Sequence, residues 1–407
     1  MAITTTQRIR DWTGPALLSF GFRPFFLMGA IWAALAMLIW LPMLMGAIAP
    51  PPVFTPVDWH AHSMLYGYSA AAVAGFVLTA VPNWTGRLPV TGWPLAGLTG
   101  LWILGRAATT LPLALPSFVI AAADLSLFAA LLFVLLREIV AGKNWRNLPV
   151  VGLFSLFVAG LVVFHVQARG GAAAQDWGFR LSLGALVMLM TLIGGRIIPS
   201  FTRNWLVRRG ETALPAPMGR PDKAALATGA AALIAFVIAP DARLTAAICG
   251  MAGIAHLIRL SRWCGGATAP EPLLWILHLA YAWVAVGFLS VAASGVGLML
   301  PAGARHVWMA GGIGVLTLAV MSRASLGHTG RELTAGRGLT IVFLLVNLAA
   351  VLRLIYALAP GQMWTLHAAG TAWIAAFGGF AALYWPILTG PRVSARRPSG
   401  NQVKQPG

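Results

Sequence analysis

Long runs of apolar residues, separated by short polar gaps, make up most of the chain. The runs show neither the alternation of strands nor the one-sided periodicity of soluble helices, and they reach the roughly 20 residues that a membrane-spanning helix requires. The pattern predicts an all-α, polytopic membrane protein embedded in the lipid bilayer. We place about twelve transmembrane helices at residues 25–45, 60–81, 93–111, 115–136, 148–167, 177–199, 222–239, 244–260, 272–293, 306–326, 338–358 and 363–388.

The basic residues predict how these helices are oriented. With the N-terminus inside the cell, 21 of the 28 Lys and Arg residues lie in cytoplasmic segments, and four lie within the spans. The outer loops hold three, which are Arg169, Arg243 and Arg305. Cytoplasmic loops of membrane proteins collect positive charge, so we expect both termini in the cytoplasm. An odd number of helices would destroy this bias.

Composition excludes several classes of protein. Hydrophobic residues make up 59% and charged residues 9% of the chain, whereas soluble domains are about a quarter charged. The net charge of +18 lies in the gaps between spans, which indicates cytoplasmic membrane loops and no nucleic-acid partner. The two cysteines, Cys249 and Cys264, form no C-x-x-C pair. This excludes a disulfide scaffold, a zinc ribbon and covalently attached haem.

The predicted organisation has three parts. Residues 1–24 form a cytoplasmic N-terminal segment without a cleavable signal peptide, because the first apolar run is too long for one. Residues 25–390 form the twelve-helix transmembrane domain, in which a basic cytoplasmic loop at residues 200–221 separates two sets of six helices. Residues 391–407 form a basic, disordered cytoplasmic tail.

Most of the eight histidines fall at one membrane depth. Five lie near the outer ends of their spans, whereas His256 and His328 lie at inner ends and His278 lies about two turns from the cytoplasm. The outer five are His60, His62, His165, His306 and His367. Imidazoles from several helices can meet in a bundle core and bind iron or copper. A single histidine at a helix end is more often an interfacial hydrogen-bonding residue, and this alternative stays open.

His60 and His62 are separated by one residue, and this spacing restricts how they can act. On a regular helix, residues two apart point to nearly opposite sides. Both rings can bind one ion only if the backbone is extended there. Otherwise they serve two centres, or one ring binds a metal while the other hydrogen-bonds to a ligand.

Four arginines also lie at the outer level of the membrane: Arg106, Arg180, Arg305 and Arg353. A ligand with carboxylates at that depth, such as the propionates of haem, would give these guanidinium groups bidentate partners. Two structural alternatives are extension to the membrane surface and pairing with Asp124, the one acid deep in a span. Spans three and four form a hairpin that would bring Asp124 near Arg106.

Several motifs, in this order, resemble those of the NnrS family over residues 15–390. They are Phe22-Arg23-Pro24-Phe25-Phe26, Trp59-His60-Ala61-His62, Thr79-Ala80-Val81-Pro82-Asn83-Trp84-Thr85-Gly86, Gly194-Gly195-Arg196-Ile197-Ile198-Pro199, Leu277-His278-Leu279-Ala280-Tyr281-Ala282-Trp283 and Met321-Ser322-Arg323-Ala324-Ser325-Leu326-Gly327-His328-Thr329-Gly330-Arg331. The resemblance implies a multi-pass protein of the bacterial cytoplasmic (inner) membrane. It further implies non-covalent b-type haem, copper, and a role in denitrification and the response to nitric oxide.

The resemblance also implies a ligand set. His60, His62, His278, His306 and His328 match family motifs, and His165 is a looser match. His367 is proposed from its depth alone. The family motif usually continues with Glu after the second histidine of the second span, and this chain has Ser63 there. Serine cannot hold the negative charge, so the substitution puts proton-coupled chemistry in doubt.

Three functions are compatible with these observations. The first is a haem- and copper-binding protein that binds, detoxifies or responds to nitric oxide or a similar small gas. If it is an enzyme, it is an oxidoreductase acting on nitric oxide and needs an electron donor that the sequence does not identify. The second is a twelve-span small-molecule transporter, although the loop at residues 83–89 lacks the Asp-Arg-x-Gly-Arg pattern. The third is a haem–copper nitric oxide reductase-like enzyme, although the adjacent His-His pair is absent.

Overall fold

A computed structural model describes residues 12–393, and the elements in this range are helices and turns. The first six rods are α2 (Phe22–Leu44), the continuous α3 (Pro56–His62), η2 (Ser63–Ser69) and α4 (Ala70–Thr85), α5 (Trp93–Thr110), α6 (Ser117–Ala141), α7 (Leu148–Gln167) and α8 (Trp177–Arg208). The second six are α9 (Arg220–Ile238), α10 (Arg243–Ser261), α11 (Pro272–Gly295), the continuous α12 (Pro301–His306), η7 (Val307–Val315) and α13 (Leu316–His328), α14 (Arg337–Leu358) and α15 (Met363–Thr389).

The rods confirm an all-α membrane architecture. Eleven of them are long and apolar enough to cross a membrane. The twelfth, α5, has 18 residues and packs against α6 as the first arm of a hairpin. The chain is therefore a multi-pass membrane protein with the number of helices that the apolar runs predict. The cytoplasmic location of both termini remains a prediction.

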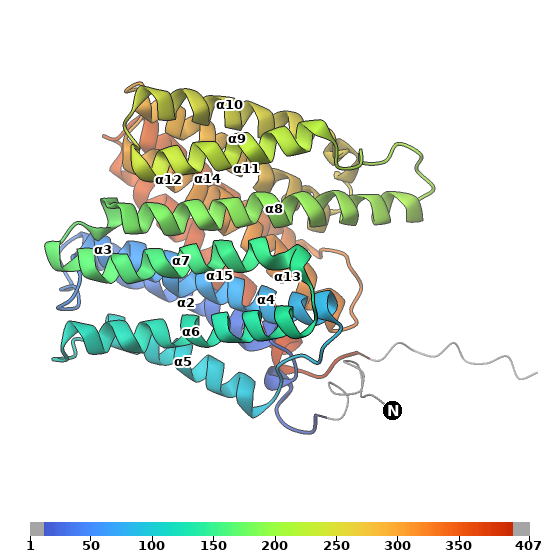
Figure 1. Cartoon of the computed structure of the whole chain (residues 1–407), viewed down its shortest axis with the longest axis horizontal. Helices are drawn as coiled ribbons and strands as arrows, with labels where there is room; N and C mark the ends of the chain where they lie inside the picture. The colour runs from blue at the N-terminus through green and yellow to red at the C-terminus, as the bar shows by residue number, and fades with distance from the viewer. Residues whose placement is uncertain (1–11, 394–407) are drawn as a thin grey trace, which may run out of the picture.

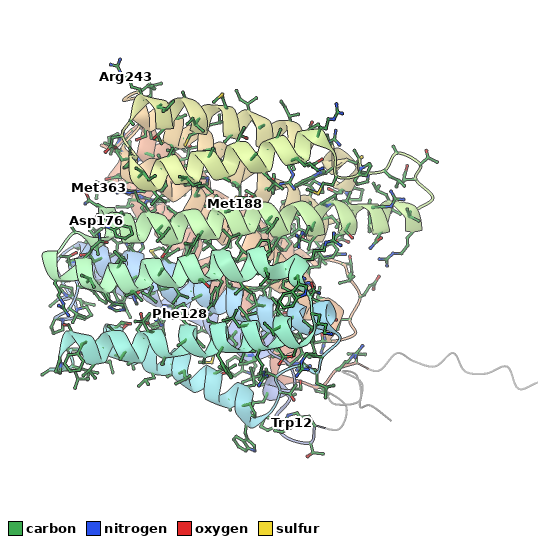
Figure 2. All side chains as sticks on the ribbon, in the orientation of Figure 1. Trp12, Phe128, Asp176, Met188, Arg243 and Met363 are labelled. Carbon is green, nitrogen blue, oxygen red and sulfur yellow. The ribbon has the colours of Figure 1, made fainter. Side chains whose placement is uncertain are left out.

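Helices that follow one another along the chain pack as antiparallel neighbours. The pairs α7 and α8, α10 and α11, and α14 and α15 make extensive contacts, and α15 also packs against α2. Figure 1 shows α9, α8 and α7 side by side, with α2, α3, α4 and α15 behind them. Apolar side chains fill the spaces between the rods (Figure 2), and the contact of α15 with α2 brings the first and last rods together.

The loop between the two sets of six is shorter than the sequence suggests. Pro199 does not end its helix, because α8 continues to Arg208, and the connection to α9 covers only residues 209–219. The expected loop at residues 200–221 is corrected accordingly. A single proline removes one backbone hydrogen bond, which a membrane helix tolerates when neighbouring groups replace it. The hydroxyl of Thr202 donates to the carbonyl of Ile198 at 3.0 Å within this turn.

Two rods contain a segment of π-helix, which the sequence does not predict. η2 begins directly after His62, and η7 begins directly after His306. π-Helical turns are rare and occur frequently at functional sites. Each segment widens the helix one residue beyond a histidine that the sequence already indicates as a metal ligand.

Candidate metal centres

Helix α3 begins at a well-defined cap that fixes the direction of its two histidines. The hydroxyl of Thr55 accepts a hydrogen bond from the backbone N–H of Asp58 at 3.2 Å, and Pro56 occupies the first helical position. This combination is favourable at a helix N-terminus. The Asp58 carboxylate also accepts from the backbone N–H of Ala174 at 2.7 Å, which ties α3 to the segment before α8.

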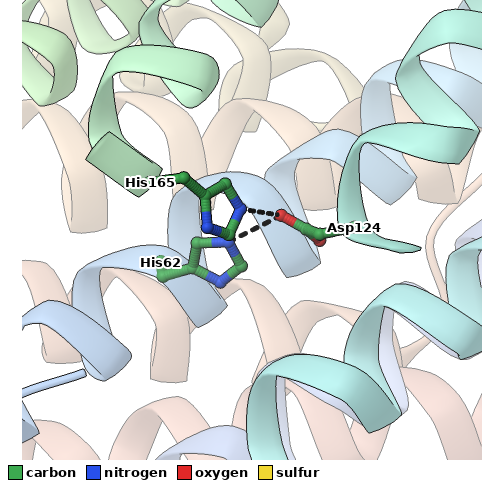
Figure 3. Close-up of side chains that lie close together, drawn as sticks. All are labelled: His62, Asp124 and His165. Atoms are coloured by element: carbon green, nitrogen blue, oxygen red, sulfur yellow. Dashed lines mark hydrogen bonds and ion pairs between the residues drawn. The ribbon is translucent and has the colours of Figure 1, made fainter. Parts of the chain in front are cut away.

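Asp124 holds two imidazoles together below this cap (Figure 3). The Nε2 atoms of His62 and His165 lie 2.8 and 2.9 Å from the same oxygen, Oδ2 of Asp124. The three residues come from α3, α6 and α7, and one ligand atom from each lies within 4.8 Å of the others. His62 and Asp124 are buried, and His165 is half-buried. We call this group the Asp124 cluster.

Arg106 compensates the buried negative charge of the cluster. Its guanidinium is paired with Oδ1 of Asp124, the oxygen that the imidazoles do not use. Gly105 lies against Asp124, so that α5 and α6 approach closely enough to form the pair. The hairpin pairing proposed as a structural alternative for Arg106 is thus present. Because the charges of Arg106 and Asp124 cancel, the two imidazoles can lie beside them at a lower electrostatic cost.

Several polar atoms of this cluster have no partner within residues 12–393. They include Nδ1 of His62, the hydroxyl of Ser63, and Nε and one terminal nitrogen of Arg106. Phe54 stacks on the His62 ring with a centroid distance of 4.9 Å and keeps the site apolar on that side. Buried polar atoms without partners are uncommon, and they can indicate an ion or ligand that the site normally holds.

The Asp124 cluster offers two ways to hold a small cation. The ion can lie between the carboxylate and the two rings, or it can bind Nδ1 of His62 while Asp124 orients the ring through Nε2, as carboxylates often do at metal sites. Either way, Asp124 supplies from α6 a carboxylate beside His62. The Ser63 position therefore lacks the family glutamate, but the site does not lack negative charge.

His60 belongs to a second cluster. Its ring stacks on Trp40 with a centroid distance of 4.3 Å and an interplanar angle of 17°. The ring of His306 lies 6.3 Å away, within 12° of parallel. Nδ1 of His306 donates to the carbonyl of Ala302 at 2.7 Å, so Nε2 carries the free lone pair. No hydrogen bond within residues 12–393 reaches Nε2 of either ring.

These two rings line a cavity of about 380 Å³, which we call the outer cavity. Its walls are mainly apolar, and Arg305 and Arg353 reach it from α12 and α14. A terminal nitrogen of Arg353 and Nδ1 of His60 are buried without partners within the described residues. A volume of this size, lined by apolar groups with a few convergent polar ones, is typical of small-molecule and cofactor sites. The arrangement offers two imidazoles and two guanidinium groups to one flat, anionic ligand.

The structure places His60 and His62 in two different groups of side chains. α3 is a regular helix over both residues, so their side chains point in different directions. His60 points to the outer cavity with His306, and His62 points to the Asp124 cluster with His165. One turn of helix therefore contributes to both sites.

Other predicted site residues lie outside both clusters. Both ring nitrogens of His278 lie within 3.3 Å of backbone carbonyls, those of Leu274 and Trp263. His328 stacks on Phe20 with a centroid distance of 5.3 Å.

His367 and Arg180 also lie apart from these groups. His367 is half-buried on α15 and does not line the outer cavity. Arg180 donates to the backbone carbonyls of Gln175 and Val237. Depth along the membrane therefore does not by itself identify which side chains meet.

Sequence reasoning treated Asp124 as a partner for one arginine and missed its position at the centre of a histidine cluster. The available signal was its isolation, because acids buried in a membrane are costly and commonly functional.

Two histidine-lined sites in a bundle of apolar helices define a multi-pass membrane protein suited to binding metals. The family model described as NnrS protein matches residues 16–392, and the chain belongs to the NnrS family. No curated protein matches the chain.

Proposed function

We propose that the protein is a haem- and copper-binding protein of the bacterial inner membrane that binds, detoxifies or responds to nitric oxide. Membership of the NnrS family supports the proposal, and the observation that carries it is the division of His60 and His62 between two different sites. A protein that holds two unlike metal groups needs two such sites. Reduction of nitric oxide would in addition require an external electron donor.

The Asp124 cluster suits copper. Imidazole is a favoured ligand of copper and iron, and a neighbouring carboxylate can bind the ion or orient a ring. His62 and His165 would hold the ion, with Asp124 as the third ligand or as the orienting group. Because the pair of Arg106 and Asp124 is already neutral, the charge of a bound ion would be buried without compensation. The cluster therefore suits a monovalent cuprous ion better than a divalent one.

The outer cavity suits haem. His306 and His60 would hold the iron, and Arg305 and Arg353 would pair with the propionates. The hydrogen bond from Nδ1 of His306 to Ala302 fixes the tautomer that a metal requires. Bound haem would supply an iron that can bind nitric oxide in place of one of the two imidazoles. Trp40 stacks on the ring of His60 and confines it.

The proposal is tested by the visible absorption spectrum of the detergent-purified protein, with iron and copper assayed together. We expect a Soret band and both metals in the unmodified chain. His60→Ala should remove haem and retain copper, whereas His62→Ala should remove copper and retain haem. His367→Ala is the control, because this ring lies at the same depth but outside both clusters.

The same measurements can overturn the proposal. Absence of a Soret band after expression with ample haem would favour the transporter alternative. Loss of both metals in each of the two single variants, with retained folding, would contradict the assignment of separate sites. Loss of either metal in His367→Ala would show that depth in the membrane, rather than membership of the two clusters, determines which histidines bind metal.

A further inference from the structure

A second and smaller cavity, which we call the inner cavity, lies beyond the outer one. It has a volume of about 70 Å³ and is bounded by α2, α4, α8 and the start of α13. Of the described residues that line it, all but Thr317 have apolar side chains or none. They are Phe26, Ala72, Val73, Phe76, Leu186, Leu189, Met190, Ile193, Gly194, Ile197, Leu316, Thr317, Val320 and Met321.

The hydroxyl in this lining is already engaged. Oγ1 of Thr317 donates to the carbonyl of Ile313 at 2.6 Å. Since that bond uses its hydrogen, the hydroxyl of Tyr68 must be the donor in the hydrogen bond between Tyr68 and Thr317. No free donor therefore faces the inner cavity from this pair. A water molecule needs two to four polar partners, and the inner cavity does not offer them.

The two cavities lie one after the other along the same helices. Tyr68 and Ile313 line the outer cavity, and Thr317 lines the inner one. On α8, Phe179 lines the outer cavity and Leu186 lines the inner cavity two turns further on. The hydrogen bond between Tyr68 and Thr317 therefore lies between the two cavities.

The lining of the inner cavity is not fully buried. Leu186, Met190 and Leu316 are buried. Ile193 and Val320, further along the same helices, are partly exposed, and so is Thr317. Partly exposed side chains therefore connect the inner cavity with the surface of the bundle.

Size and chemistry together select the occupant. A water molecule takes about 30 Å³ of liquid volume, and apolar cavities of this kind stay dry yet bind small apolar species such as xenon. We propose that the inner cavity binds an uncharged apolar molecule of two or three atoms, such as a dissolved diatomic gas, and leads it toward the outer cavity past Tyr68 and Thr317. Binding is independent of the proposed function, whereas delivery to a haem rests on it.

Xenon pressurisation of crystals of the full chain tests the binding. We expect an anomalous xenon peak in the inner cavity. Ordered water, a lipid acyl chain, or no peak at this position would overturn the proposal. Ala72→Leu, which fills the cavity from α4, should abolish the peak. Ala129→Leu is the matched control, because Ala129 is exposed on α6 and the same enlargement should leave the peak unchanged.

A second variant that fills the inner cavity keeps the test valid if Ala72→Leu does not fold. Val320→Phe acts at a partly exposed position, where a larger ring is tolerated, and should also abolish the peak. A peak that persists in both folded filling variants would contradict the position of the site.

Delivery is tested on the haem-loaded protein by recombination of carbon monoxide after flash photolysis. Val320→Phe should slow bimolecular recombination several-fold, and Ala129→Leu should not change it. Equal rates in the two variants would overturn delivery and leave the xenon result intact. A protein without haem would instead overturn the proposed function, and the xenon measurement would still decide the binding site.

Discussion

At the level of single residues, Asp124 determines how the Asp124 cluster is assembled. It is buried and accepts hydrogen bonds from two imidazoles on one oxygen while Arg106 pairs with the other. A carboxylate in a membrane interior is costly unless such partners compensate it. The arrangement therefore depends on the charge of Asp124 as well as on its hydrogen bonds.

Asp124→Asn keeps the shape of the side chain and removes its charge. Arg106 is then left buried without an opposite charge, which should destabilise the protein by about 3 to 5 kcal/mol. Copper per chain should fall in the same variant. Denaturant unfolding in detergent and a copper assay provide the measurements. Asp241→Asn is the control, since Asp241 is exposed between α9 and α10. Unchanged stability in Asp124→Asn would contradict the role of this charge.

Arg353 gives a separate prediction for the outer cavity. One of its terminal nitrogens is buried without a partner within the described residues, as expected if it pairs with a carboxylate of the bound ligand. Arg353→Gln should therefore weaken haem retention, measured as loss of the Soret band during transfer to apomyoglobin. Arg243→Gln alters an exposed outer arginine and should retain haem at the unmodified rate. Equal loss from both variants would argue against a propionate partner.

At the residue scale, the sequence identifies most of the relevant side chains but not their partners. Depth groups five histidines, yet His165 meets His62 whereas His367 meets neither cluster. The reason is that hydropathy gives position along the membrane normal only. Position around the bundle depends on which helices are neighbours, and this follows from packing between distant segments. Asp124 was visible as an isolated acid, but its imidazole partners were not.

At the scale of helices, apolar runs predict existence and approximate limits well. The clearest differences are the extension of α8 past Pro199 and the π-helical segments η2 and η7. A run of apolar residues does not distinguish an α-helix from a π-helix, because both satisfy the backbone internally. The change from α-helix to π-helix after His62 and His306 is therefore visible only in the structure.

Gly67 provides the test of the η2 segment. A Cβ atom added there would collide with the indole nitrogen of Trp32 and with the guanidinium of Arg106. Gly67→Ala should thus displace Arg106 from the Asp124 cluster, lower copper content, and cost about 1 to 3 kcal/mol of stability through overpacking. Gly100→Ala on α5 meets nothing within 4 Å and is the control. A Gly67→Ala protein with full copper content would show that η2 does not position the cluster.

At the scale of the whole molecule, both candidate sites lie at the same end of the bundle. The outer cavity is lined by residues at the C-terminal end of α2 and the N-terminal ends of α12 and α15. The distribution of Lys and Arg predicts that this end faces away from the cytoplasm. A haem site there would receive gas from the periplasmic side, and the inner cavity would receive it from deeper in the membrane.

This orientation is decided by cysteine labelling in intact cells, on a background in which Cys249 and Cys264 are replaced by alanine. Asp241→Cys lies in a predicted outer loop and Glu211→Cys in the predicted cytoplasmic connection between α8 and α9, and both positions are exposed. A membrane-impermeant maleimide should label the first and not the second, and both should react after the cells are lysed. The reverse pattern would place the outer cavity on the cytoplasmic side. Because the charge bias is carried by many loops, a single loop substitution should leave the pattern unchanged.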